Sequence, residues 1–152
     1  MLRSQLNDAL KKAMLSRDTR AVSTVRLILA ALKDRDIAAR AKGNMEGVED
    51  SEILQMFYQM VKQRRDSIAL YEQGGRLDLA QQEAEEIVVI ERFLPRQLHE
   101  DEIAEAVVAT ISDLDASGLK DMGRVMAALR ERYAGQMDFG KAGIMVKARL
   151  SG

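Results

Sequence analysis

The sequence predicts an all-α protein, with an N-terminal four-helix domain followed by a small three-helix domain. Apolar residues recur at the three- and four-residue spacing of amphipathic helices along most of the chain. The 152 residues include one proline, and only 4% are aromatic. β-sandwiches and barrels depend on turn residues and on β-branched alternation, so this composition disfavours them.

The first two helices are expected over residues 2–15 and 19–40, and each has an apolar stripe. The stripe residues are Leu2, Leu6, Leu10 and Met14 in the first helix, and Val22, Val25, Leu29 and Leu32 in the second. Residues 41–50 hold two glycines and an asparagine, which indicates a loop.

The next two helices are expected to form an antiparallel hairpin. The third begins near Asp50 or Ser51, which are good N-cap residues, and stops at Gly74-Gly75. The fourth covers residues 77–94 and ends before Pro95. A two-glycine stop between helices of this length favours a tight reversal of the chain.

Pro95 is the expected domain boundary, with residues 1–95 before it and residues 96–152 after it. The fifth helix opens at His99 and ends near residue 113, with Glu102 at the position of a capping-box glutamate. The sixth helix is expected over residues 119–132 and the seventh over residues 139–150, with turns around Gly118 and Gly135.

Several kinds of chemistry are missing from the sequence. Without cysteine there is no disulfide, no thiolate nucleophile and no cysteine-ligated zinc. No nucleophile elbow or phosphate-binding loop occurs, so no catalytic, cofactor or metal residue is assigned. The single histidine, His99, is interpreted as a surface or capping residue, and the adjacent Glu85 and Glu86 as solvated charges.

The expected location is the cytoplasm, with no membrane partner. The first residues carry charges throughout and lack the apolar core of a signal peptide. No apolar run approaches the roughly 18 residues that a membrane span requires.

Arg64 falls on the apolar face of the third helix, seven residues after Phe57 and four before Ile68. A charge on that face needs a partner, because an unpaired buried charge is strongly destabilising. The hairpin places Arg64 opposite Glu83 or Ala84, so a structural Arg64–Glu83 ion pair is predicted. Contact with RNA is the alternative role for Arg64.

Charge is segregated after Pro95. Residues 97–117 contain six acidic side chains and no lysine or arginine, whereas residues 118–152 contain seven basic and three acidic side chains. Because the net charge of the whole chain is −1, nucleic acid would have to bind such a local patch. A solvated face with ordinary helical ion pairs remains the alternative.

Methionines at four-residue spacing suggest a second kind of surface. The pairs are Met56 with Met60, and Met122 with Met126. Met-rich surfaces adapt to protein partners, although core packing explains the same spacing.

Taken in order, the motifs of the chain resemble the GatB/YqeY family. The match runs through Arg20–Leu32, Lys62–Ile68, Tyr71, Gly75-Arg76, Asp78–Ala80, Glu83, Glu86, Ile90, Phe93–Pro95, Gln97-Leu98 and Lys120–Met126. It covers nearly the whole chain, and it departs from the family pattern at His99, where a serine-like cap is usual.

The resemblance implies a relation to the C-terminal region of the B subunit of the glutamine-dependent tRNA amidotransferase. In that enzyme the corresponding tail helps to hold tRNA. Carbon–nitrogen ligase activity with glutamine as the amide donor is therefore implied only as part of a larger complex. The resemblance makes Lys120, Gly123 and Arg124 candidate tRNA contacts, and charge alone adds Lys141 and Lys147.

Three functions follow as hypotheses. The first is an accessory protein that binds tRNA or another structured RNA through the C-terminal helices. The second is a helical adaptor for a protein partner, without nucleic-acid binding. The third is an amidotransferase-type enzyme that works only with another subunit.

Overall fold

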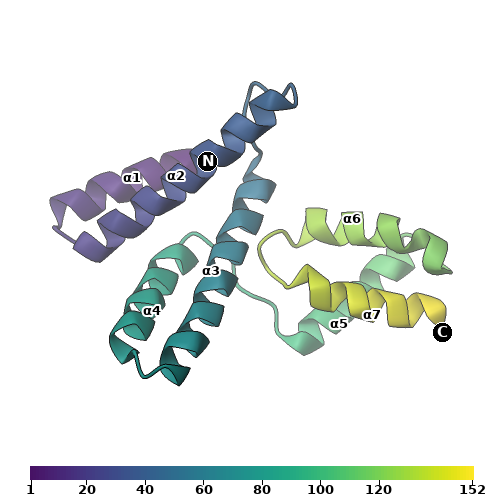
Figure 1. The fold of residues 1–152 in the computed structure, drawn as a ribbon. Helices are drawn as coiled ribbons and strands as arrows, with labels where there is room; N and C mark the ends of the chain where they lie inside the picture. The colour runs from purple at the N-terminus through teal and green to yellow at the C-terminus, as the bar shows by residue number, and fades with distance from the viewer. The chain divides into compact units, whose positions relative to one another are not determined.

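The computed structural model describes all of residues 1–152 and contains seven α-helices, one short 3-10 helix and no strand (Figure 1). The expected all-α class is confirmed. The chain divides into two compact units, Met1–Leu94 and Pro95–Gly152. No helix combines the length and apolarity that crossing a membrane requires.

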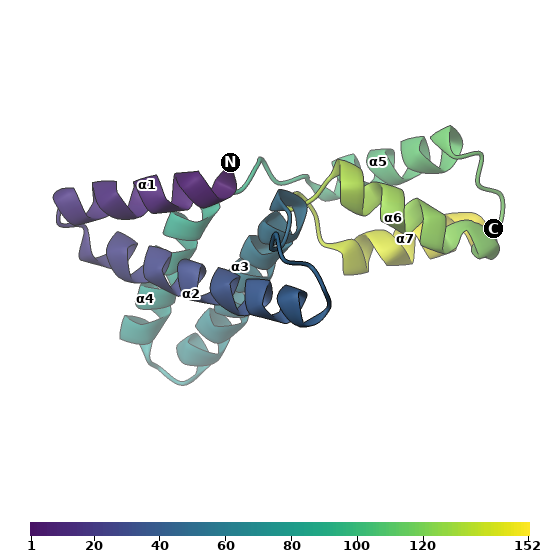
Figure 2. The same cartoon turned by 90° about the horizontal axis from the view of Figure 1, so that it is seen from above.

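The first unit begins with a helical hairpin of α1 (Leu2–Leu15) and α2 (Thr19–Ala41) (Figure 2). Asp18 caps α2, because its carboxylate accepts a hydrogen bond from the Ala21 backbone N–H at 3.1 Å. Arg17, just before this cap, has a left-handed backbone with φ +57°. This conformation lets the chain reverse between the two helices.

A second hairpin joins α3 (Asp50–Gln73) to α4 (Leu77–Glu91). The chain reverses at Gly74-Gly75, where Gly75 has φ +73°. The predicted end of the fourth helix at Leu94 is wrong, since α4 ends at Glu91 and the next residues form a turn. Pro95 has no backbone N–H to donate to the Glu91 carbonyl four residues earlier, and this carbonyl instead accepts the Leu94 N–H at 3.1 Å in a tighter turn.

All four helices contribute to the core of the first unit. Leu6, Ile28, Phe57 and Ile90, one from each helix, are fully buried. Leu6 and Phe57 lie on the predicted apolar faces, whereas Ile28 was not among the predicted stripe residues. The predicted stripe residue Met14 lies outside the core, with 51% of its surface exposed. Near the α1–α2 turn, Ala13, Ala21, Val25 and Val89 form a smaller apolar cluster.

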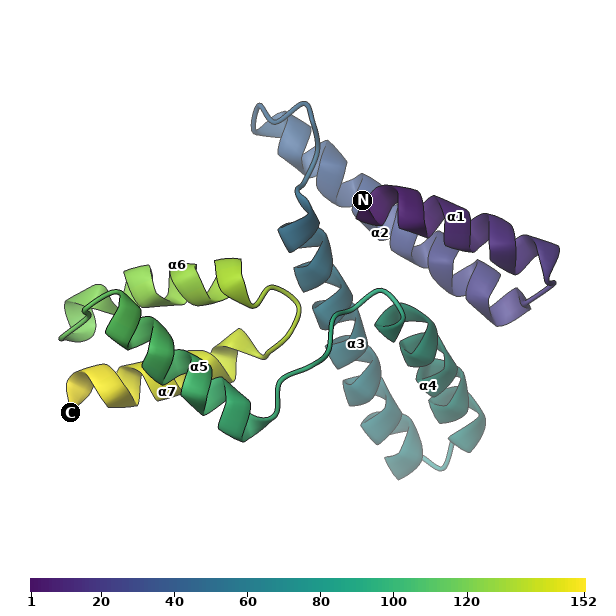
Figure 3. The same ribbon diagram turned by 180° about the vertical axis from the view of Figure 1, so that it is seen from behind.

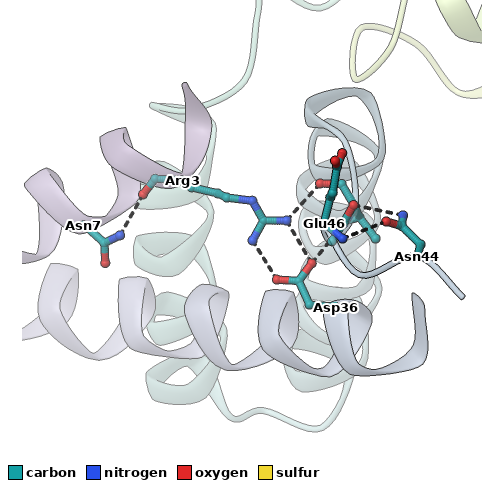
Figure 4. A network of polar contacts seen from close by, with 7 residues as sticks. Arg3, Asn7, Asp36, Asn44 and Glu46 are labelled. Carbon is teal, nitrogen blue, oxygen red and sulfur yellow. Dashed lines mark hydrogen bonds and ion pairs between the residues drawn. The ribbon is translucent and has the colours of Figure 1, made fainter. Parts of the chain in front are cut away.

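The loop between α2 and α3 is fixed by an ion pair (Figure 4). The Arg3 guanidinium donates to both carboxylate oxygens of Asp36, at 2.6 and 2.8 Å, and to the carbonyl oxygen of Val48 at 2.9 Å. The Asp36 carboxylate also accepts the Val48 N–H at 3.0 Å. These contacts connect α1, α2 and the loop, and place Val48 in the core.

Arg64 on α3 lies close to both Glu83, its predicted partner, and Glu86, which was expected to be a solvated charge. Its guanidinium lies 3.8 Å from Glu83, and it lies nearer, at 3.0 Å, to Glu86. The interpretation of Glu86 as a solvated charge is wrong, because only 9% of its side chain is exposed. Glu86 and Ile90 are four residues apart and therefore share the buried face of α4.

The second unit contains α5 (Glu100–Asp113), η1 (Leu119–Asp121), α6 (Met122–Arg132) and α7 (Phe139–Ser151) (Figure 3). The three α-helices share a core around Val107, Val125, Leu129 and Val146. The predicted single helix over residues 119–132 instead begins with a separate 3-10 turn. In that turn, the Asp121 N–H donates to the Gly118 carbonyl oxygen at 2.9 Å.

The methionine pairs belong to the two cores. Met56 and Met126 are buried, and Met60 and Met122 pack against the same clusters. Their core interpretation is confirmed, so these residues do not form an exposed partner groove.

Candidate nucleic-acid interface

Lys120 and Arg124 occupy neighbouring positions where η1 passes into α6, but their side chains have different surroundings. The Lys120 side chain is exposed and forms no ion pair. Arg124 donates to the Leu114 carbonyl oxygen at 2.9 Å and lies 3.2 Å from an Asp121 carboxylate oxygen. Arg124 therefore stabilises the turn between α5 and η1, while about half of its side chain stays exposed.

Gly123, in the first turn of α6, has no packing reason to be glycine. A Cβ built at this position would have no neighbour within 4 Å, and the backbone does not require a positive φ. Glycine within a helix is less stable than alanine by up to about 1 kcal/mol. Glycine at this position therefore makes the unit slightly less stable than alanine would. It also leaves the backbone exposed at the surface beside Lys120.

The two lysines of α7 do not share one face. Lys141 and Lys147 are six residues apart, which separates their directions by about 120° around the helix axis. Lys141 lies 3.6 Å from Glu100 at the start of α5, in an exposed pair. Lys147 is exposed and has no ion pair.

Two other basic side chains of the unit have partners within it. Arg132 pairs with Asp113 at 2.9 Å, and the Arg130 guanidinium lies over the Phe139 ring at 5.9 Å. The positive groups that remain exposed and unpaired include Lys120 and Lys147. An exposed lysine beside open backbone, such as Lys120 beside Gly123, can hold phosphate oxygens by charge and hydrogen bonding.

Asp121 organises this region, and its role was not apparent from the sequence. Its carboxylate accepts the Ser117 N–H at 3.0 Å and also contacts Arg124. The Ser117 hydrogen bond is the main cause that lowers the pKa of Asp121 below its usual value, followed by Arg124. The available signal was an aspartate at a helix start, where such side chains commonly bind backbone N–H groups.

Gln97 and Leu98 hold the entry segment of the second unit. The Gln97 side-chain amide donates to the Gly135 carbonyl oxygen, and the Leu98 N–H donates to the Gln136 carbonyl oxygen at 2.8 Å. Gln97 and Leu98 therefore have a structural role, which is to attach the entry segment to the turn before α7. No group of three or more histidine, aspartate or glutamate side chains is arranged to hold a metal ion.

The fold has seven α-helices and no strand, and its second unit presents exposed lysines. These features define a small, all-helical class of protein. Residues 3–150 match the Yqey-like protein family, and the chain belongs to that family.

Among its relatives is "Altered inheritance of mitochondria protein 41, mitochondrial" of Kluyveromyces lactis. It is 34% identical over 115 residues, covering 74% of this chain and 60% of the relative. The proteins of that name from Lachancea thermotolerans and Saccharomyces cerevisiae are each 30% identical over 91 residues. Those matches cover 60% of this chain, and 46% and 47% of the relatives. The chain thus spans about half the length of the curated relatives it matches.

These relatives contradict the expected cytoplasmic location. All three carry names that place them in the mitochondrion. The expectation came from the charged N-terminal residues and the lack of an apolar segment, and these features do not identify a compartment.

Proposed function

We propose that this chain is an accessory protein that binds tRNA or another structured RNA through its second unit. The observation that carries the proposal is Gly123, a helical glycine with open space around it and with exposed Lys120 nearby. A phosphate can approach bare backbone more closely than it can approach a side chain. The resemblance of its motifs to the tail of the tRNA amidotransferase B subunit also favours this proposal.

The contact is expected to be electrostatic, with Lys120 and Lys147 as phosphate ligands. Lys141 is expected to contribute when it leaves its exposed pair with Glu100, which is weak in solution. Arg124 is expected to act mainly by holding the turn that presents Lys120. Nothing in this arrangement supplies a nucleophile, so any carbon–nitrogen ligase activity belongs to a larger complex.

The test is tRNA binding measured by fluorescence anisotropy at several salt concentrations. Affinity is expected to fall steeply with salt, and Lys120→Glu is expected to weaken binding and reduce the salt slope by about one. Lys120 is a cleaner target than Arg124, because reversing Arg124 also removes the contacts with Leu114 and Asp121.

Lys42→Glu is the matched control, since it makes the same charge change on an exposed residue of the first unit. Equal tRNA affinity for Lys120→Glu and Lys42→Glu would refute the proposed interface. No binding by the wild type at low salt would refute RNA association altogether.

A protein-adaptor role is the second candidate, and a groove between α5 and α7 favours it. It consists of two hollows that share Ala104 and Arg149. Val108 lines one of them and is 41% exposed, and Met145 and Ala148 line the other. A partner held there by apolar contacts should remain bound at high salt, where RNA dissociates. Val108→Ser removes apolar surface without changing the charge, so it should release the protein partner while leaving tRNA affinity unchanged.

A further inference from the structure

The first unit contains a hollow that none of the functions above uses. It lies among α1, α2 and α4 and has a volume of about 270 Å³. It is lined by Ala9, Lys12, Ala13, Ser16, Asp18, Ala21, Val25, Val89, Arg92 and Phe93. All of these residues lie in Met1–Leu94, so the hollow belongs wholly to this unit.

The hollow has an apolar floor because small residues face one another across the helices. Ala13 and Ala21 are buried, and both belong to the cluster that contains Val25 and Val89. With methyl groups in place of larger side chains, the helices leave space that the core does not fill. Phe93, packed against this cluster, gives the hollow an aromatic wall.

The exposed part of the lining carries two basic side chains without partners. Lys12 and Arg92 both line the hollow and are exposed, and neither side chain forms a hydrogen bond or an ion pair within the chain. The one acidic residue in the lining, Asp18, is engaged in capping α2 through the Ala21 N–H. The two basic side chains of Lys12 and Arg92 outnumber the single Asp18 carboxylate, so the lining has a net positive charge.

We propose that this hollow binds a small organic anion, an aromatic or branched aliphatic group that carries a phosphate or carboxylate. The apolar part would rest on Ala13, Ala21 and Phe93, while Lys12 and Arg92 would hold the anionic group. Ligand sites of this kind combine a mostly apolar surface with a few placed polar groups. The volume is near the lower end for such sites, which suits a single ring rather than a nucleotide.

Phenyl phosphate is the probe, titrated into the ¹⁵N-labelled full chain and followed by amide chemical shifts. We expect saturable shifts at amides of the lining, including Ala13, Ala21 and Phe93. Inorganic phosphate has only the anionic group and benzyl alcohol only the ring. Each should therefore bind at least about tenfold more weakly than phenyl phosphate. Non-saturable shifts, or shifts spread over both units, would overturn the proposal.

Charge variants separate this site from general attraction to a basic surface. Lys12→Gln and Arg92→Gln should each weaken phenyl phosphate by about tenfold, the effect expected from losing one charge-assisted contact. Lys11→Gln is the matched control, because Lys11 is equally exposed on α1 but lies outside the lining. Equal affinities for the three variants would overturn the assignment.

A variant that fills the hollow tests its apolar part. Ala13→Leu should abolish binding of phenyl phosphate while Lys12 and Arg92 remain. If this variant fails to fold, the surface variants above still decide the question, since they leave the core untouched. Unchanged binding in a folded Ala13→Leu protein would place the ligand elsewhere and overturn the proposal.

Discussion

Arg64 of α3 and Glu86 of α4 form an ion pair of 3.0 Å in which both side chains are largely buried, with 14% and 9% exposed. Arg64 also donates to the Met60 carbonyl oxygen one turn earlier on its own helix. The pair connects the two helices of the hairpin at a position where an apolar contact would otherwise be expected. Removing one partner leaves a buried charge without compensation, which is far more destabilising than losing an exposed pair.

Arg64→Met is therefore expected to lower the free energy of unfolding by about 3 kcal/mol, because Glu86 is left buried and unpaired. Glu86→Gln keeps the shape and an acceptor for Arg64, so its effect should be smaller, about 1–2 kcal/mol. Urea denaturation followed by circular dichroism measures both. A loss below about 0.5 kcal/mol for Arg64→Met, the level of an ordinary surface substitution, would contradict the structural role of the pair.

Glu83→Gln is the matched substitution one turn away, and its effect should have the opposite sign. Burial raises the pKa of Glu83 above its usual value, and the nearby Glu86 charge adds to this effect. A carboxylate with a raised folded-state pKa destabilises the fold when it is ionised, so protonating it as pH falls stabilises the fold. At neutral pH Glu83→Gln should leave stability unchanged or slightly higher, while Glu86→Gln lowers it.

Asp36 should make the first unit sensitive to acid. Its hydrogen bonds with Arg3 are the main cause that lowers its pKa to about 2. Because the folded-state value lies below the usual one, the stabilisation is complete above about pH 4 and is lost as pH falls toward 2. Urea midpoints measured across this range should fall less steeply in Asp36→Asn than in the wild type. Parallel pH profiles for the two proteins would contradict the assignment.

Gly47 and Gly43 allow backbone strain to be separated from a steric clash. Both have left-handed φ, +91° and +93°. A Cβ at Gly47 would lie 2.7 Å from an Asp36 carboxylate oxygen and 2.9 Å from Arg3, whereas one at Gly43 would meet nothing. Gly43→Ala should cost about 1 kcal/mol from backbone strain alone. Gly47→Ala should cost about 1–2 kcal/mol more, because the Arg3–Asp36 pair must shift. Thermal unfolding compares them, and equal losses would rule out the steric effect.

Gly123→Ala should stabilise the second unit while weakening RNA binding. The helix gains about 0.5 kcal/mol from the better helix former, and the structure offers the new methyl group open space. If a phosphate rests on this backbone, the same methyl group should reduce tRNA affinity. Anisotropy and urea denaturation on one sample test the two effects together. A more stable variant with unchanged tRNA affinity would remove Gly123 from the proposed interface.

The helices could be predicted because their signals are local. Apolar stripes and the Gly74-Gly75 stop each act within a few residues along the chain. The helix end predicted at Leu94 was wrong because the pattern of apolar side chains continues past the point where Pro95 disrupts the backbone. The split of residues 119–132 into η1 and α6 depends on hydrogen bonds of Asp121 that apolar periodicity does not reveal.

The candidate interface was predictable only as a set of charges. The sequence identified Lys120, Arg124, Lys141 and Lys147 as basic residues, but not where their side chains point. Arg124 turns toward the Leu114 carbonyl oxygen and Lys141 toward Glu100, contacts between residues ten and forty-one positions apart. Contacts of this separation depend on how whole helices pack.

The sequence alone determined that this chain is all-helical and where most of its helices lie. Those properties follow from the spacing of apolar residues, because this spacing sets which face of each helix is buried. Only the tertiary structure decided that Arg64 lies nearest to Glu86, that Asp36 holds a distant loop, and that alanines leave a hollow beside Lys12 and Arg92. Each of these depends on the rotation of one helix against another, which is set by packing between elements.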